Sequence, residues 1–229
     1  MCIRDRMVNY LQHHRGSLYV MQKTDHFSTQ HQPAVAVVDV DGVLFDYSGR
    51  LATIAAEVTG RPLHHFPPAE SWSFMTEQWG MTFEAYERLV HQGVREYGLF
   101  GVGIPLPGTL AGWQELRRHV DKIHIATHCG FGETEGLAQQ LRLVWLEQWG
   151  FTHDALTFTA DKAAVAAQYL EESWSVYSIE DYDKNFHALA DVGAHSFIQH
   201  QRWNRHLETG NRVRDIEEFA HRVALHRVG

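Results

Sequence analysis

Cysteine is scarce in this chain of 229 residues, which contains only Cys2 and Cys129. Two cysteines cannot build the disulfide framework that stabilises small secreted domains. No apolar run approaches the roughly 20 residues that a membrane-spanning helix needs. Residues 1–33 are polar, rich in histidine and glutamine, and lack the apolar stretch of a signal peptide, so we expect a poorly ordered tail. The sequence therefore predicts a soluble, cytoplasmic protein with no membrane partner.

Runs of lysine and arginine are also missing, and the formal net charge is −8 with neutral histidines. Long nucleic acids are bound through basic patches, so this acidic balance argues against a polynucleotide partner. The chain is long enough for one sizeable domain with an insertion, and its hydrophobic content of 44% is ordinary for a globular protein. The composition leaves the oligomeric state open, with a homodimer as one alternative.

The 17 histidines do not form a recognisable zinc motif. His124 and His128 are spaced four residues apart, as in helical zinc sites, and Cys129 follows them. However, the segment Lys122–Thr127 alternates in polarity and predicts a strand, in which residues four positions apart lie far from each other. No second pair of ligands is evident in the sequence, so we do not expect a zinc site.

The most informative motif is the apolar run Ala34–Val38 followed by Asp39, Asp41 and Gly42. Such a run predicts a buried parallel strand, and open α/β sheets bind ligands at the carboxyl ends of their strands. The side chains of Asp39 and Asp41 point the same way in an extended segment, and Gly42 lets a backbone amide approach an anion. Because two adjacent carboxylates repel each other, the pair indicates a bound cation or a shared proton.

A calcium-binding loop and a helix cap account less well for this motif. Asp-x-Asp-Gly also begins calcium-binding loops, but those carry a glutamate at the twelfth position, where this chain has Arg50. Acids also cap helices, yet a cap would account for one aspartate and not for both. We therefore interpret the motif as a reactive or cation-binding pair.

The order of the expected elements predicts a core with an insertion. From residue 47 to residue 108 the pattern is helical, whereas after residue 109 helices and strands alternate, which is typical of a parallel sheet covered by helices on both faces. We expect an α/β fold with a three-layer α/β/α core of residues 34–46 and 109–229, and a small helical cap of residues 47–108 inserted after the first strand. The expected strands are 34–38, 122–127, 156–159, 175–179 and 195–199; the expected helices are 48–58, 71–80, 83–97, 109–120, 133–149, 162–171, 184–192 and 215–227.

Polar residues collect where these strands end. Thr127 ends the second core strand, and Glu180 and Asp181 end the fourth, with Asn185 four residues further on. Lys162 opens a helix, a position that the helix dipole disfavours for a cation, which indicates that it holds an anion. The carboxyl ends of sequential parallel strands gather at one edge of a sheet. The two acidic pairs can then hold a hard divalent cation, most naturally Mg²⁺, through oxygen ligands.

Together with Asp39 and Asp41, this ordered set resembles the four signature motifs of the haloacid dehalogenase superfamily, over residues 34–200. The resemblance implies that Asp39 is a nucleophile and that Asp41 is a general acid and then a base. Members of the superfamily with this second aspartate are mostly phosphatases. The resemblance therefore implies phosphomonoester hydrolysis through an aspartyl-phosphate intermediate. The implied site has Mg²⁺ held by Asp39, the backbone carbonyl of Asp41, Asp181 and, through water, Glu180; phosphate bound by Thr127, His128, Lys162 and Gly42; and Asn185 in a supporting role.

Within that superfamily the chain is similar to the 5′(3′)-deoxyribonucleotidase branch, on short stretches at residues 66–68, 79–82, 104–108 and 201–205. The similarity implies a (deoxy)nucleoside monophosphate as substrate, and aromatic side chains suit a nucleobase because stacking is favourable. Most aromatics at helical spacing fill a core, so we expect only one or two of the four candidates to contact a ligand. A sugar phosphate, a 3′-phosphate nucleic-acid end and a non-catalytic binding protein of the same fold are the alternatives. The candidates are Phe45, Trp72, Phe74 and Trp79.

Overall fold

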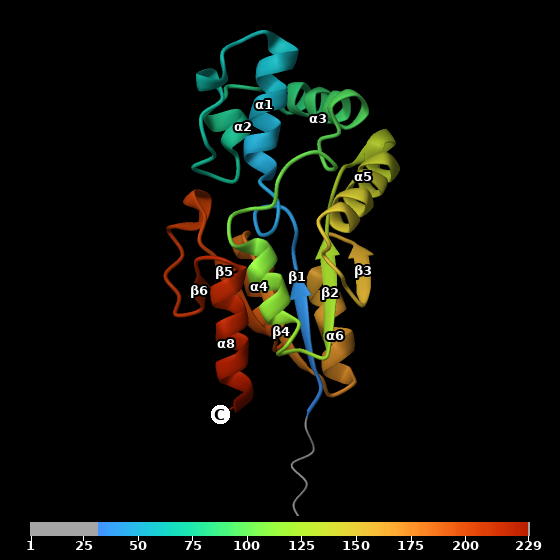
Figure 1. Cartoon of the computed structure of the whole chain (residues 1–229). Helices are drawn as coiled ribbons and strands as arrows, with labels where there is room; N and C mark the ends of the chain where they lie inside the picture. The colour runs from blue at the N-terminus through green and yellow to red at the C-terminus, as the bar shows by residue number, and fades with distance from the viewer. Residues whose placement is uncertain (1–31, 229) are drawn as a thin grey trace, which may run out of the picture. The chain divides into compact units, whose positions relative to one another are not determined.

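The computed structural model describes residues 32–228, which contain a six-stranded parallel sheet (Figure 1). The strand order is β3-β2-β1-β4-β5-β6, so β1 pairs with β2 on one side and β4 on the other. This confirms the predicted α/β fold with a parallel sheet. The predicted tail, residues 1–33, lies outside the described residues except for its last two. The strands are β1 (Ala34–Val38), β2 (Lys122–Thr127), β3 (Ala155–Phe158), β4 (Ser175–Glu180), β5 (His195–Gln199) and β6 (Arg212–Val213).

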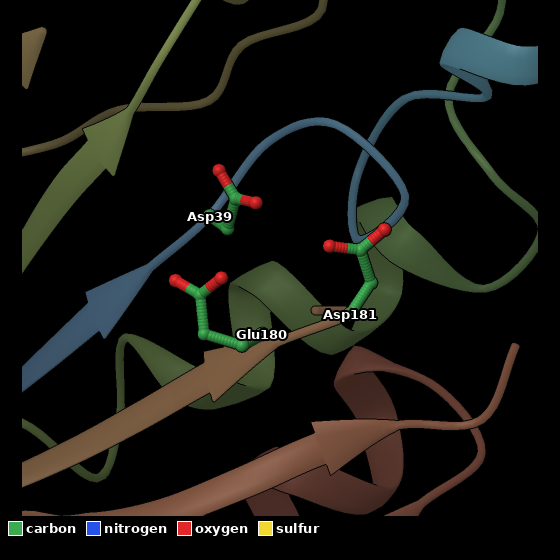
Figure 2. Close-up of side chains that lie close together, drawn as sticks. All are labelled: Asp39, Glu180 and Asp181. Atoms are coloured by element: carbon green, nitrogen blue, oxygen red, sulfur yellow. The ribbon is translucent and has the colours of Figure 1, made fainter. Parts of the chain in front are cut away.

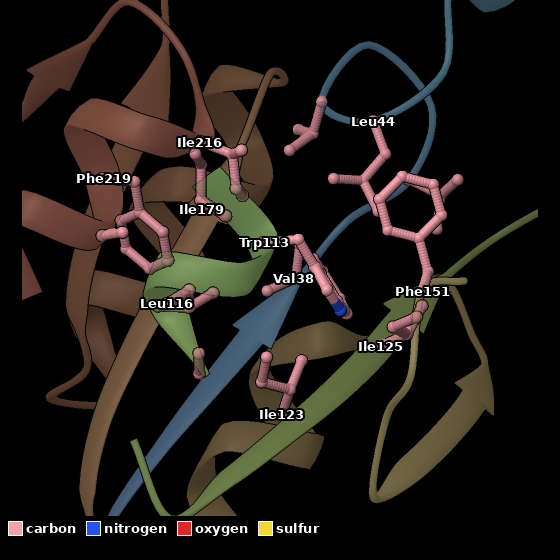
Figure 3. Close-up of a cluster of buried hydrophobic side chains, with 14 of the residues drawn as sticks. Val38, Leu44, Trp113, Leu116, Ile123, Ile125, Phe151, Ile179, Ile216 and Phe219 are labelled. Atoms are coloured by element: carbon pink, nitrogen blue, oxygen red, sulfur yellow. The ribbon is translucent and has the colours of Figure 1, made fainter. Parts of the chain in front are cut away.

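Both faces of the sheet are covered, and β1 illustrates how. Alternate residues of a strand point to opposite faces. Ala34, Ala36 and Val38 belong to one apolar cluster, completed by α4 and α8 and drawn in Figure 3, whereas Val35 and Val37 belong to another, completed by α6 and α7. Burial on both faces explains why this strand is a continuous apolar run. The helices are α4 (Thr109–Leu116), α6 (Lys162–Glu171), α7 (Asp183–Asp191) and α8 (Ile216–Val228).

Helices α1, α2 and α3 lie together beyond the carboxyl ends of the central strands (Figure 1). They share an apolar cluster that includes Leu51 of α1 and Val90 of α3. Helix α1 is capped by Asp46, whose side chain accepts the amide N–H of Gly49 at 2.9 Å. The bounds are α1 (Tyr47–Thr59), a 3-10 turn (Leu63–His65), α2 (Phe74–Glu77) and α3 (Phe83–Tyr97); α5 (Glu135–Gln148) follows β2.

The segment 71–80 is not the single helix that the sequence predicts. Only Phe74–Glu77 is helical. The side chains of Gln78 and Trp79 form hydrogen bonds to the backbone of residues 67–70, and such bonds hold the remainder as a loop. Strand β6 was not predicted either, because two residues carry no periodic pattern.

No helix within residues 32–228 combines the length and the apolar character needed to cross a lipid bilayer. The longest of them, α3, has 15 residues, short of the roughly 20 that a bilayer requires.

Candidate active site

Three carboxylates gather at the carboxyl ends of β1 and β4 (Figure 2). Asp39 directly follows β1, and its amide N–H donates to the carbonyl of Ile179 at 3.2 Å, which extends the pairing of the two strands. Glu180 is the last residue of β4, and Asp181 follows it. All three acids are buried, and one oxygen of each lies within 4.8 Å of the others. The pairing of β1 with β4 therefore brings acids from both predicted pairs together.

Burial makes two of these acids, Glu180 and Asp181, difficult to ionise. The pKa of Asp181 is raised well above its ordinary value by burial and by the charges of Asp39 and Glu180. The pKa of Glu180 is also raised, because burial outweighs the favourable charge of Lys162. Three buried oxygen donors that repel one another fit a hard divalent cation such as Mg²⁺, whose charge would offset the repulsion.

The ammonium of Lys162 lies between Asp39 and Glu180. Its Nζ is 2.8 Å from Asp39 Oδ2 and 2.8 Å from Glu180 Oε1. Burial alone would lower the pKa of this lysine, but the two carboxylates raise it above its ordinary value, so the charge is retained. Asn185 donates to the other oxygen of Glu180 at 3.2 Å. The carboxylates of Asp39 and Glu180 are thus the anions that the structure pairs with this lysine.

The amide of Gly42 has a partner within its own loop, and its predicted contact with phosphate stays a prediction. Its N–H donates to the carbonyl of Phe45 at 2.8 Å within the loop after β1. The glycine is needed for another reason: φ is +75°, and a Cβ here would lie 1.9 Å from Oδ2 of Asp181. The side chains of Gln199 and Gln201 brace the loop by donating to the carbonyl of Gly42.

Asp41 is paired with Arg142, a residue that the sequence reasoning missed. Arg142 Nη2 lies 2.5 Å from Asp41 Oδ1. Burial raises the pKa of Asp41 to about 6, against the lowering effect of the arginine. Arg142 lies on α5 in step with Ala138, Trp145 and Leu146, all of which are buried. A charged residue inside a helical apolar stripe was the signal that would have revealed it.

Thr127 and His128 have different environments. Thr127, the last residue of β2, is completely buried, and its hydroxyl has no hydrogen-bond partner among the described residues. A buried hydroxyl without a partner is unfavourable unless a ligand or water bonds to it. The side chain of His128 is exposed. Thr127 is therefore the better supported of the two candidate phosphate contacts, and His128 stays a prediction.

A cavity of about 110 Å³ opens beside Asp41 and Asp181. Its walls include Trp72 and Phe74, two of the four aromatic candidates. Trp72 is half exposed and stacks on Tyr182, with ring centroids 3.9 Å apart. Both aromatics thus lie where a ligand extending from the carboxylates would meet them. The lining also includes Gly42, Tyr47, Ser48, Ser71, Met75, Tyr86 and Trp203.

The other two aromatic candidates, Phe45 and Trp79, are core residues. Phe45 is 1% exposed and packs edge-on against Trp145. Trp79 is buried and packs edge-on against Phe66. Neither lines the cavity beside the aspartates, because their large apolar surfaces fill the clusters around them.

A second cavity of about 690 Å³ adjoins the first, and Gly42, Ser48 and Trp203 line both. Trp203 and Asn204 also donate to the backbone carbonyl of Asp181, at 3.1 and 2.8 Å, and so fix the acidic loop. In the sequence, residues 201–205 stood out only through their similarity to the 5′(3′)-deoxyribonucleotidase branch. Its role depends on a contact between residues more than twenty positions apart, which no local pattern reveals.

The six-stranded parallel sheet with its covering helices has the fold of the haloacid dehalogenase type. A superfamily hydrolase of Geobacter sulfurreducens matches with a TM-score of 0.52 at 14% identity, over 83% of this chain and 96% of its own. The Bacillus subtilis HAD-hydrolase YfnB, whose structure contains magnesium, matches with a TM-score of 0.53 at 13% identity, over 84% of this chain and 99% of its own. At these identities the likeness establishes the fold.

The sequence comparisons identify the family. Residues 33–226 match the family described as 5' nucleotidase, deoxy (Pyrimidine), cytosolic type C. A Chlorobaculum tepidum protein named "Putative 5'(3')-deoxyribonucleotidase" is 31% identical over 173 residues, which cover 75% of this chain and 81% of that protein. The chain belongs to this nucleotidase family, and it is an enzyme of the phosphatase class, which confirms the predicted resemblance.

Proposed function

We propose that this protein is a Mg²⁺-dependent phosphomonoesterase that uses Asp39 as its nucleophile and acts on (deoxy)nucleoside monophosphates. The observation that carries the proposal is the environment of Asp39, a buried carboxylate in contact with the Lys162 ammonium and beside Glu180 and Asp181. Positive charge next to a nucleophilic carboxylate offsets its repulsion from an anionic phosphate.

In the first step, an oxygen of Asp39 attacks phosphorus and the bond from phosphorus to the ester oxygen breaks, which leaves an aspartyl phosphate and an alcohol. Asp41 gives its proton to the departing oxygen. Its pKa, raised to about 6 by burial, leaves part of the population protonated near neutral pH. The Thr127 hydroxyl and the Lys162 ammonium bond to phosphoryl oxygens and stabilise their charge.

In the second step, water attacks the phosphorus of the aspartyl phosphate. Asp41, now ionised, accepts a proton from this water, and the bond between phosphorus and the Asp39 oxygen breaks. Phosphate leaves and the Asp39 carboxylate is regenerated. One group acts as acid and then as base, which requires a pKa near the working pH.

The groups proposed to hold Mg²⁺ are Asp39, Asp181 and the backbone carbonyl of Asp41, with Glu180 acting through water. When bound, the ion screens the charges of the carboxylates and the phosphate from one another. Glu180 has a second task, because its two oxygens lie 2.8 and 2.9 Å from Lys162 Nζ and so fix the ammonium beside Asp39.

Residues 47–108 are proposed to form a cap that selects the substrate. The cavity of about 110 Å³ beside Asp41 is smaller than the roughly 300–1,000 Å³ of typical ligand pockets. It therefore receives the phosphate and the adjoining sugar, near the paired hydroxyls of Tyr47 and Tyr86, which are 3.0 Å apart. Trp72 and Phe74 offer ring faces to a base. The name of the Chlorobaculum tepidum relative supports a nucleotide substrate.

The test is phosphate release by the purified protein from nucleoside 5′- and 3′-monophosphates, sugar phosphates and oligonucleotides with 3′-phosphate ends. We expect nucleoside monophosphates to react fastest, and activity to be lost in EDTA and restored by Mg²⁺. A preference for sugar phosphates or for 3′-phosphate ends would contradict the proposed substrate. Ligand binding without turnover would identify a non-catalytic binding protein.

Asp39→Asn tests the nucleophile. The variant should lower kcat by at least about 10³-fold, because an amide is a poor nucleophile towards phosphorus. The matched control is Asp161→Asn, at the exposed cap of α6, where asparagine caps as well as aspartate and kcat should stay within about twofold. Wild-type activity in Asp39→Asn would rule out the mechanism.

A further inference from the structure

Arg142 is a charged residue in an apolar interior. Its side chain is 0% exposed. The guanidinium carbon lies 4.5 Å from the centre of the Phe45 ring and 5.4 Å from the centres of the Phe100 and Trp145 rings. Two of its nitrogens, Nε and Nη1, have no hydrogen-bond partner in the part of the chain that the structure describes. Burial of an arginine is costly, so a specific interaction has to compensate for it.

The ion pair with Asp41 is that interaction. Arg142 Nη2 donates to Asp41 Oδ1 at 2.5 Å, and across residues 32–228 no other acidic group forms an ion pair with this arginine. The thiol of Cys129 is also close to the guanidinium, but burial raises its pKa to about 12, so it stays neutral. The two charged residues are 101 positions apart in sequence. The fold, and not a local motif, therefore creates the pair.

The aromatic surroundings restrict the orientation of Arg142. A planar guanidinium packed against three rings presents its N–H groups in fixed directions. Asp41, by contrast, has two rotatable side-chain bonds and is repelled by the nearby charge of Asp39. Arg142 opposes that repulsion and engages only Oδ1, so that Oδ2 is left for proton transfer.

We propose that Arg142 is the positioning residue for Asp41, holding Oδ1 so that Oδ2 faces the ester oxygen when the proton moves. The inference rests on the proposed function, in which Asp41 is the acid and base. Arg142 acts through Asp41 and does not touch the substrate. Only those steps that move a proton should then depend on it.

The test compares Arg142→Met with the wild type on phosphate monoesters whose leaving groups differ in acidity. A nucleoside 5′-monophosphate releases an alkoxide that needs a proton, whereas p-nitrophenyl phosphate releases a phenolate that does not. In the first turnover, followed by rapid mixing, we expect a loss of about 10²-fold or more for the nucleotide and less than about threefold for p-nitrophenyl phosphate. KM for the nucleotide should change little, and Arg142→Lys, which keeps a charged donor, should recover about tenfold of the loss.

A double-mutant cycle with Asp41→Asn tests whether the two residues act as a unit. If Arg142 acts through Asp41, adding Arg142→Met to Asp41→Asn changes the first-turnover rate of the nucleotide by less than about twofold. Equal slowing of all esters by Arg142→Met, or fully additive losses in the cycle, would overturn the inference, because either result assigns the arginine to the fold or to phosphate binding.

Two controls keep the test decisive. Thermal unfolding shows whether Arg142→Met is folded; if it is not, Arg142→Gln, which keeps a hydrogen-bond donor without the charge, takes its place in the same comparison. A wild-type protein that hydrolyses aryl phosphates but no nucleotide would contradict the proposed substrate. The ratio of phenyl phosphate to p-nitrophenyl phosphate rates would then still measure the effect of Arg142 on proton transfer.

Discussion

At the scale of single residues, Gly42 and Gly60 both have a positive φ, +75° and +66°, but different surroundings. A Cβ at Gly42 would lie 1.9 Å from Asp181 Oδ2, whereas one at Gly60 would meet no atom of the described residues within 4 Å. Alanine at Gly60 would add only the strain of a left-handed backbone, whereas alanine at Gly42 would also press on Asp181, the proposed metal ligand.

Replacement of each glycine by alanine should make this separation measurable. Both variants should lose roughly 1–2 kcal/mol of unfolding free energy, because a Cβ strains the left-handed conformation. Only Gly42→Ala should also displace Asp181, weakening Mg²⁺ binding by about tenfold or more in a calorimetric titration and lowering kcat further. An unchanged Mg²⁺ affinity in Gly42→Ala would contradict the placement of Asp181 in the metal site.

Thr127→Val removes a hydroxyl that has no partner within residues 32–228. The loss of an unpaired buried hydroxyl should leave the unfolding free energy unchanged or slightly higher, whereas kcat should fall about 10–100-fold because a phosphoryl contact is lost. Thr157→Val is the matched control: its Oγ1 lies 2.8 Å from His124 Nε2, so it should cost about 1 kcal/mol without affecting kcat. Denaturant unfolding measures the first quantity and phosphate release the second. A Thr127→Val variant with a lower unfolding free energy and an unchanged kcat would show that Thr127 does not contact the phosphate.

At the scale of elements, the loop at residues 67–72 of the proposed cap contacts the core through ion pairs and an aromatic stack. Glu70 accepts hydrogen bonds from Arg202 and Arg205 at 3.0 and 3.2 Å, and Trp72 stacks on Tyr182. The ion pairs are exposed, and exposed pairs contribute about 0–1 kcal/mol each. These two ion pairs therefore add little to the stability of the loop, and the Trp72 stack is the contact to test.

Trp72→Ala tests the proposed contact between this loop and the substrate. We expect KM for nucleoside monophosphates to rise about tenfold, because a ring face for the base is lost, while KM for glycerol phosphate, which has no ring, stays within about twofold. Phe83→Ala removes another exposed aromatic of the cap, one that lines neither cavity, and should change neither value. Equal effects on both substrates would indicate that Trp72 only stabilises the cap.

At the scale of the whole molecule, the raised pKa values of the acidic cluster link folding stability to pH. Burial raises the pKa of Asp41 from 3.8 to about 6, and the pKa values of Glu180 and Asp181 are raised too. These carboxyls bind protons more tightly in the folded than in the unfolded chain. Their stabilising contribution is therefore complete below their ordinary pKa values and is lost as the pH rises through the raised ones.

The metal-free enzyme should accordingly become less stable from about pH 4 to pH 8. In EDTA we expect Tm to fall by the order of 5–10 °C over this range, and in saturating Mg²⁺ the decline should largely disappear, because the cation offsets the charges that ionisation leaves in the cluster. Thermal unfolding at a series of pH values, with and without Mg²⁺, measures both slopes. A Tm that rises with pH in EDTA would contradict the raised pKa values.

Local patterns in the sequence were sufficient to predict much of this protein. The apolar run before Asp39 predicts a buried parallel strand, and the alternation of elements after residue 109 predicts the sheet. The helical pattern of residues 83–97 predicts α3 with the bounds that the structure has. Such signals succeed because they depend on neighbours within a few positions, where backbone geometry sets which side chains share a face.

Contacts between distant segments were decided only by the tertiary structure. The pairing of Arg142 with Asp41 joins residues on different elements, and Phe45 and Trp79 are core residues because of what packs around them. The sequence by itself determined that two aspartates end a buried strand. The fold decided how their surroundings act on them, because burial and the charges brought near by packing set the orientation and the pKa of a carboxylate.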